Sequence, residues 1–211
     1  SDGHLYKAND MVKADCGGCN GCSRCCHGMG NSIILDPYDV YRMTTGMGKS
    51  MQELLAASVE LNVVDGVILP NLKMQGAEEA CAYLDGRGRC SIHPYRPGIC
   101  RLFPLGRYYE NGGFSYFLQT GECAKENRSK IKVSKWIDTP DLTRNQQFTL
   151  QWHDLLHAME ERLTGEDEGK QREENLLLLR LFYLLPYEGT IDFYTQFTER
   201  MEHWNGQNGQ I

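Results

Sequence analysis

Cysteine is the residue type in this sequence with the clearest capacity for chemistry. Nine cysteines lie within the first 123 of 211 residues. Thiolates are soft ligands for zinc and for iron–sulfur clusters, and close spacing on a glycine-rich loop brings them together at little entropic cost. An odd number of cysteines, two of them adjacent, fits poorly with a closed set of disulfides. The sequence therefore predicts a metal site built from Cys16, Cys19, Cys22, Cys25, Cys26, Cys81, Cys90, Cys100 and Cys123 or a subset of them.

The dense first run of cysteines can be divided in two ways. One division has the spacing of a bacterial ferredoxin ligand run, although His27 stands where proline is expected. The other includes Cys25 and leaves Cys16 over. Both remain open at this point, the first using Cys16, Cys19, Cys22 and Cys26 and the second Cys19, Cys22, Cys25 and Cys26.

Other uses of the cysteines lead to different expectations. A thiol–disulfide function through the Cys-x-x-Cys steps would require a βαβ setting, which the sequence does not predict. A single cysteine is often only a small buried hydrophobe, but eight in two spaced groups favour metal. Zinc rivals iron–sulfur, because two sites of four thiolates each would also use eight.

Two segments together resemble a known family. The run Cys19-Asn-Gly-Cys22-Ser-Arg-Cys25-Cys26 is followed by Cys81-Ala-Tyr-Leu and by residues 90–104, from Cys90 to Pro104. This pattern, over about residues 16–123, resembles the YkgJ-type cysteine-cluster family of zinc- or iron-chelating domains. The resemblance implies metal chelation by eight cysteines but no general reaction. The matching positions are Cys19, Cys22, Cys25, Cys26, Cys81, Cys90, Cys100 and Cys123, with Cys16 additional.

Charged residues near the cysteines suggest how a metal centre would be stabilised. Arg96 and Arg101 flank Cys100, and we predict that they contact the cofactor and offset the negative charge of the thiolates. Ordinary surface ion pairing is the alternative. His27 and His93 lie beside cysteines and could each replace one as a ligand.

Two further histidines, His153 and His157, are four residues apart on a predicted helix. They could form a metal pair, or they could simply flank the apolar stripe of that helix. No catalytic residue emerges, since neither a nucleotide-binding loop nor a Ser-His-Asp order has a convincing context.

Local signals predict the elements that position the cysteines. A helix should begin at Asp36-Pro37 and end at Gly46, and a capping box of Ser50 and Glu53 should begin the next. Three hairpins are predicted over residues 62–69, 81–92 and 106–118. The second should bring Cys81 and Cys90 together at its open end.

The C-terminal part should be helical. A helix from Pro140 to Gly165 has one apolar face, residues 176–185 predict a buried helix stopped at Pro186, and a final helix follows. The apolar stripe of that last helix consists of Ile191, Tyr194, Phe197, Met201 and Trp204.

The expected fold is α+β, a cysteine-rich loop and β-hairpin metal region packed on a C-terminal helical layer. Within one domain, residues 1–135 form the metal-binding region and residues 136–211 the helical region. The net charge of -6 makes nucleic acid and membrane surfaces poor partners. The beginning of the sequence has no apolar signal segment, which favours a cytoplasmic location.

The favoured function is iron–sulfur cluster binding with an electron-transfer or accessory redox role, in which the partner is an unknown protein or redox partner. The first alternative is a zinc-stabilised, non-catalytic binding module. The second is a methylase-like protein-modifying enzyme, implied only by a related cysteine cluster in flagellin lysine methylases, and the sequence shows no S-adenosylmethionine site.

Overall fold

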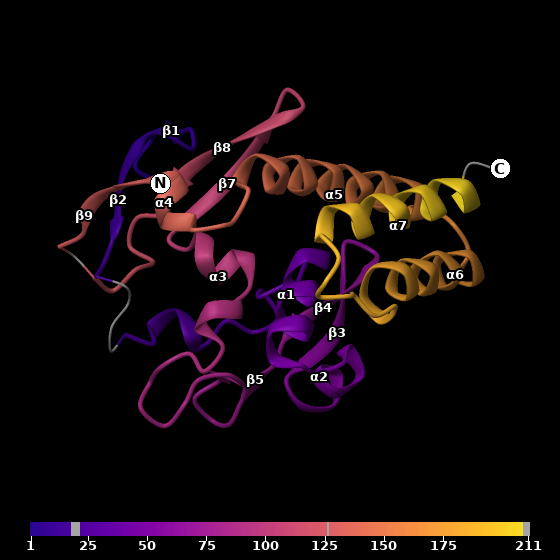
Figure 1. Cartoon of the computed structure of the whole chain (residues 1–211), viewed down its shortest axis with the longest axis horizontal. Helices are drawn as coiled ribbons and strands as arrows, with labels where there is room; N and C mark the ends of the chain where they lie inside the picture. The colour runs from indigo at the N-terminus through magenta and orange to yellow at the C-terminus, as the bar shows by residue number, and fades with distance from the viewer. Residues whose placement is uncertain (18–21, 126, 209–211) are drawn as a thin grey trace.

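The computed structural model describes residues 1–17, 22–125 and 127–208. Figure 1 shows long helices at one end of the molecule and strands at the other, with α1, α2, α3 and the β3–β4 hairpin between them. The strands form small separate antiparallel sheets rather than one continuous sheet, so the predicted α+β class is confirmed.

The strands pair within four small sheets. The orders are β1-β8-β7, β2-β9, β3-β4 and β5-β6. The bounds are β1 Leu5–Tyr6, β2 Met11–Asp15, β3 Val59–Val64, β4 Val67–Leu72, β5 Met74–Gln75, β6 Ala80–Cys81, β7 Leu105–Glu110, β8 Gly113–Leu118 and β9 Ser129–Lys132.

The helices alternate with these strands in the first half and follow one another in the second. They are η1 Arg24–Cys26, α1 Pro37–Met47, α2 Met51–Ala57, η2 His93–Tyr95, α3 Gly98–Leu102, α4 Val133–Ile137, α5 Leu142–Leu163, α6 Glu168–Leu179, η3 Arg180–Leu184 and α7 Phe193–Asn208. Among the described residues, none of these helices has the length and apolarity needed to cross a bilayer.

The starts of α1 and α2 form as the sequence predicts, each with a complete capping box. The predicted end of α1 at Gly46 is wrong, because the left-handed cap residue is Gly48, with φ 63°. Gly46 lies inside the helix, where a Cβ would overlap the ring of Tyr95 from η2. The glycine therefore permits close packing rather than ending the helix.

Two of the three predicted hairpins are confirmed, and the hairpin predicted over residues 81–92 differs. Asp65 and Gly66 turn β3 into β4 with positive φ angles of 50° and 82°, as an Asp-Gly hairpin turn requires. The β7–β8 hairpin turns at Asn111 and Gly112. Around residues 85–88 the turn forms, but Cys81 pairs with Met74 of β5 instead of closing a hairpin with Cys90.

Two apolar cores hold these elements together. The larger core combines α1, α2 and the β3–β4 hairpin with α5, α6, η3 and α7. The smaller core lies among β2, β7, β8 and α4. Leu102 of α3 belongs to the smaller core, whereas Cys100 of the same helix packs against the larger one. Helix α3 therefore joins the two, and the boundary that we predict at residue 135 stays a prediction.

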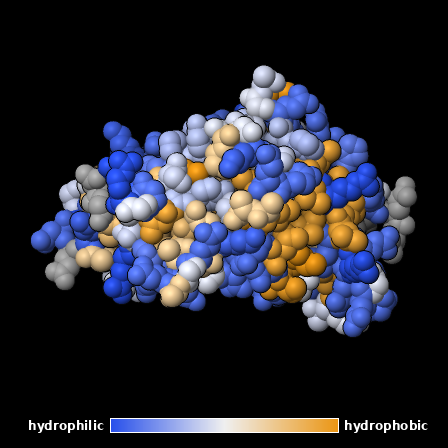
Figure 2. Space-filling view, turned by 90° about the horizontal axis from the view of Figure 1, so that it is seen from below, coloured by the Kyte–Doolittle hydropathy of each residue, from blue (hydrophilic) through white to orange (hydrophobic). Residues whose placement is uncertain are grey.

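The C-terminal helices form near their predicted positions. The segment predicted as a buried helix, residues 176–185, is only partly buried. Phe182 and Tyr183 are buried, while Leu176 is 55% exposed and Leu185 is 49% exposed. Ile191 precedes α7 and is 40% exposed. Figure 2 shows apolar side chains gathered on the side of the molecule that holds the β3–β4 hairpin and α6. On β3, Leu61 and Val63 are exposed.

Candidate metal centre

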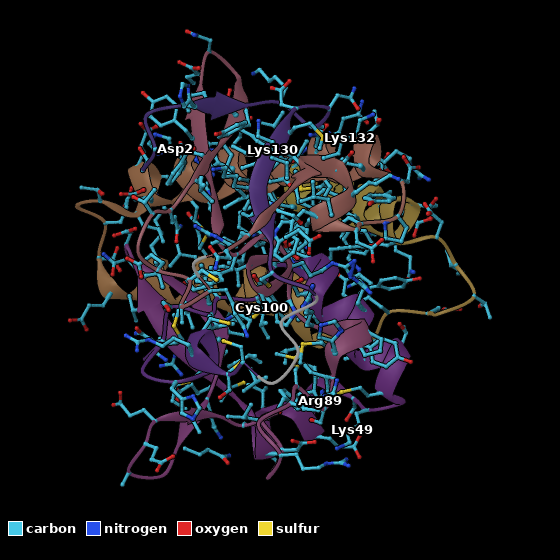
Figure 3. The ribbon with its side chains drawn as sticks, turned by 90° about the vertical axis from the view of Figure 1, so that its left-hand side faces the viewer. Asp2, Lys49, Arg89, Cys100, Lys130 and Lys132 are labelled. Carbon is cyan, nitrogen blue, oxygen red and sulfur yellow. The ribbon has the colours of Figure 1, made fainter. Side chains whose placement is uncertain are left out.

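A cavity of about 650 Å³ lies where the cysteine-bearing segments meet. Its wall includes six of the described cysteines, contributed by three separate parts of the chain. Figure 3 shows Cys100 near the middle of the view with other sulfur atoms around it. The cysteines that line the cavity are Cys22, Cys25, Cys26, Cys81, Cys90 and Cys100.

The first cysteine run reaches the cavity through the short helix η1, which ends at Cys26. It is tied to the second group by the main chain, because His27 forms a bridge with Ala80 and the Gly28 N–H donates to the Glu79 carbonyl at 3.0 Å. Cys19, predicted as a ligand, lies outside the described residues.

The second group stands on β6 and the turn that follows it. Cys81 is the last residue of β6, and Cys90 forms a bridge with Leu84 across the turn. A carboxylate oxygen of Asp85 accepts from the main-chain N–H groups of Arg87 and Arg89, each at 2.9 Å. This side chain holds the turn closed and brings Cys90 back toward Cys81.

Cys100 is positioned by contacts on both sides of the short helix α3. On one side, the Gly98 N–H donates to Asp39 Oδ1 at 2.7 Å. Asp39 is also the third residue of α1 and accepts from the Asp36 N–H, so it connects the start of α1 to the start of α3. We did not predict a role for Asp39. The Asp-x-x-Asp spacing indicates a helix cap but says nothing of a second bond to α3.

On the other side of α3, Arg101 and Trp136 make the contacts. The buried Arg101 donates through Nε to the Ile137 carbonyl at 3.2 Å and through its terminal nitrogen to the Asp138 carbonyl. Trp136 Nε1 donates to the Phe103 carbonyl at 3.1 Å. Helix α3 is therefore attached to both α1 and α4.

Comparison with known families gives one match. The family model CxxCxxCC, described as "Putative zinc- or iron-chelating domain", matches residues 18–148. The chain belongs to the CxxCxxCC family. The predicted family resemblance is thereby confirmed, and metal binding is supported while the choice between zinc and iron stays open. No curated protein and no solved structure matches this chain.

In this CxxCxxCC chain the pKa values of the adjacent thiols of Cys25 and Cys26 are shifted in opposite directions. A hydrogen bond from Cys26, aided by the charge of Arg96, lowers the pKa of Cys25 to about 6 despite burial. The same hydrogen bond and burial raise the pKa of Cys26. Cys25 therefore loses its proton before Cys26 as the pH rises.

The remaining buried thiols hold their protons more tightly. Burial raises the pKa of Cys81, Cys90 and Cys100, and the charges of neighbouring thiols raise each further. For Cys100 the nearby Asp39 carboxyl adds to the increase. A bound cation favours the ionised form, so a metal bound at these thiols would release their protons.

The two predicted cofactor-binding arginines occupy different places. Arg96 lines the cavity, and its terminal nitrogen lies 2.6 Å from Nε2 of His93, which also lines it. Arg101 is not among the lining residues, and its hydrogen bonds are to the carbonyls named above. Contact of either arginine with a cofactor stays a prediction, as does ligation by His27 or His93.

Two cysteines stand apart from the cavity wall. Cys123 does not line it, although the preceding Gly121 and Glu122 do. Cys16, which directly follows β2, is not a lining residue either. The predicted ligand role of Cys123 and the additional status of Cys16 stay predictions.

The two helical histidines lie away from the cavity. His153 stacks on Tyr109 with ring centroids 3.7 Å apart, and His157 is 3.8 Å from Glu160. Within the described ranges, no group of three or more His, Cys, Asp or Glu side chains is arranged to hold a single metal ion.

Proposed function

We propose that the cysteine-lined cavity holds an iron–sulfur cluster and that the protein serves in electron transfer or in an accessory redox role. One observation carries the proposal: six cysteines from three separate segments line a single cavity. In the proposed site these six thiolates, with Cys19 and Cys123 from the family pattern, supply the ligands.

The number of thiols at one place favours a cluster over a single zinc ion. Zinc takes four ligands in a tetrahedron, so one ion leaves at least two of the six lining thiols unused. Two independent zinc sites would require two separate groups of four. A cluster is wider and can be approached by thiolates from several directions.

The remaining lining residues suit such a centre. Ile33, Leu72 and Ile92 contribute apolar wall, which limits water, and Arg96 contributes positive charge that offsets the thiolates. A bound cluster would supply reversible one-electron uptake. The proposed partner is a redox protein, and the proposed location is the cytoplasm, where reducing conditions keep thiols reduced.

The direct test is anaerobic purification followed by metal analysis, acid-labile sulfide analysis and a visible spectrum. We expect iron, sulfide and a brown colour that bleaches on reduction. A matched pair of variants assigns the signal to the cavity, because Cys90→Ser should lose iron while Cys16→Ser should keep it. A colourless protein with stoichiometric zinc and no sulfide would overturn the cluster.

The second candidate is a zinc-stabilised binding module, favoured by the position of α3. Because α3 contacts both cores, a metal held by Cys100 would fasten them together without any redox chemistry. In that case the protein would contain zinc, would show no change on reduction, and would lose thermal stability on chelation.

A further inference from the structure

The two-stranded sheet of β2 and β9 has a buried face and an exposed face. On the buried face, Val12 and Ala14 belong to the smaller core, and Ile131 packs against it. Ile131 lies directly opposite Val12, so the two side chains point the same way. Because side chains alternate along a strand, Lys130 and Lys132 point away from the core, and both are exposed. The outer face of β9 is therefore cationic.

Strand β2 adds to the same outer face. Met11, opposite Lys132, is 50% exposed, and Lys13 is exposed between two buried residues. In the register shift that follows, a single residue of β9, Lys130, stands opposite two residues of β2, one of which is Lys13. Like charges on facing strands are destabilising. The sheet thus holds three lysines around one apolar side chain, at a cost in stability.

No carboxylate of the described residues offsets this charge. None of the ion pairs in the part of the chain that the structure describes involves Lys13, Lys130 or Lys132. Asp15, at the end of β2, instead accepts from the hydroxyl of Ser129 at 3.1 Å. A chain of net charge -6 therefore gathers three lysines on one small face, where they attract an external anion.

Both strands of this sheet connect to the cysteine-lined cavity. The first cysteine run follows β2, and its Cys22 lines the cavity. Glu122, another lining residue, precedes β9. Figure 3 faces the end of the molecule where β2 and β9 lie, and it shows Lys130 and Lys132 above Cys100. A protein bound on the lysines would therefore lie beside the segments that lead into the cavity.

We propose that the outer face of β2 and β9 is the docking site for an acidic patch on a folded redox-partner protein. The inference rests on the proposed function and names the chemistry of the partner. Carboxylates of the partner pair with Lys13, Lys130 and Lys132, and an apolar side chain of the partner contacts Met11. Complementary charge speeds the encounter of two proteins and fixes their orientation, here with the partner next to the cavity.

The small size of the face favours a local acidic patch over an extended polyanion. Charges are screened over about 8 Å at physiological ionic strength, so a partner that touches only this face is governed by the lysines. Nucleic acid or an anionic membrane extends farther and meets the rest of a chain with net charge -6. Phosphate recognition also favours the forked guanidinium of arginine, whereas this face carries lysines.

The binding test uses full-length protein with the metal it carries after anaerobic purification. The probe is fluorescein-labelled poly-L-glutamate, and fluorescence anisotropy measures its affinity. We expect saturable binding that weakens as salt rises. The triple variant Lys13→Gln, Lys130→Gln, Lys132→Gln should weaken binding by about tenfold, because three exposed charge pairs are lost.

A second triple variant controls for net charge. It removes three exposed cations that lie outside this sheet, so both triple variants change the net charge from -6 to -9. The control should bind poly-L-glutamate nearly as the wild type does. Its substitutions are Lys49→Gln, Arg172→Gln and Arg180→Gln.

A kinetic measurement tests whether the lysine face acts on the redox centre. Protein reduced with dithionite is mixed with hexacyanoferrate(III), which takes one electron from the reduced centre and becomes hexacyanoferrate(II). The net charge of -6 alone would repel this anion, so the rate would rise with ionic strength. Attraction by the lysine face reverses the sign. We expect the rate to fall with salt in the wild type and in the control, and to rise with salt in the lysine variant.

Several results would overturn the proposal. They are equal poly-L-glutamate affinity in the lysine variant and the wild type, an equal loss in the control, and tighter binding of duplex DNA or phosphatidylserine vesicles than of poly-L-glutamate. A wild-type protein that takes up no electron from dithionite would overturn the proposed redox function and the redox character of the partner. That result is distinguishable, because the anisotropy titration needs no electron transfer and reports the docking site by itself.

Discussion

The larger core is stabilised by one kind of interaction and the walls of the cysteine-lined cavity by another. In the larger core, the rings of Trp152 and Phe182 contact each other edge to face with their centroids 5.1 Å apart, and Phe182 is fully buried. In the cavity region, short segments are fixed by single hydrogen bonds such as Gly98 N–H to Asp39 at 2.7 Å. Apolar burial is distributed over many residues, so the core should fold without metal, whereas the cavity depends on few contacts.

The largest expected effect is on the core. Phe182→Ala should lower the free energy of unfolding by about 3–5 kcal/mol, because it leaves a cavity among buried aromatic rings. The metal content per folded chain should be unchanged, since Phe182 does not line the cavity. Denaturant unfolding and metal analysis of the folded fraction check both statements. A loss of metal from folded protein would show that the two regions are not independent.

The next effect concerns the link between α1 and α3. Asp39→Ala removes the acceptor for the Gly98 and Asp36 N–H groups, and a buried donor left without a partner costs about 1–3 kcal/mol. Because α3 carries Cys100, metal affinity should fall as well. Metal retention in competition with a chelator measures this.

Asp39→Asn is the matched control. Asparagine keeps one oxygen, which can accept from the Gly98 N–H as Asp39 Oδ1 does, but its amide nitrogen cannot accept from the Asp36 N–H, which pairs with Oδ2. Rescue of metal affinity by Asn would support positioning. Equal loss in both variants would point to the carboxyl group itself.

A loss of stability of similar size is expected at Arg101. Arg101→Met removes hydrogen bonds from a charged donor to two carbonyls of the α4 segment, at a cost of about 1.5–3 kcal/mol. Hydrogen exchange should increase in α4 and the smaller core. If instead exchange is unchanged and the metal centre alone is altered, Arg101 acts on the cofactor as its sequence position predicts.

The smallest effect is expected at Cys16. Cys16→Ser should leave metal content and stability unchanged, because Cys16 does not line the cavity, whereas Cys22→Ser and Cys25→Ser should each reduce metal content. The ferredoxin-like division makes a different prediction, in which Cys16→Ser is damaging and Cys25→Ser is mild. Metal per chain in the three variants decides between them.

The sequence by itself determined the chemistry of the site and much of the local structure. Soft thiols at this spacing indicate metal, and the caps of α1 and α2 and the turn at Asp65-Gly66 form as predicted. These features depend on residues a few positions apart, whose preferred dihedrals and hydrogen bonds are local properties. The end of α1 was predicted wrongly because Gly46 makes room for the ring of Tyr95, a residue distant in the sequence, and does not end the helix.

Only the tertiary structure decided which groups share the cavity and what holds them there. The bond from Gly98 to Asp39 spans 59 positions, and the bond from Arg101 to Ile137 spans 36. Cys81 lines the cavity while its main chain pairs with Met74 of β5 and not across the predicted hairpin, and Arg101, next to Cys100 in the sequence, donates to the Ile137 carbonyl of α4. Such contacts follow from how separate elements pack, because a side chain's nearest partners in space are set by burial and hydrogen bonding across the fold and not by its place in the chain.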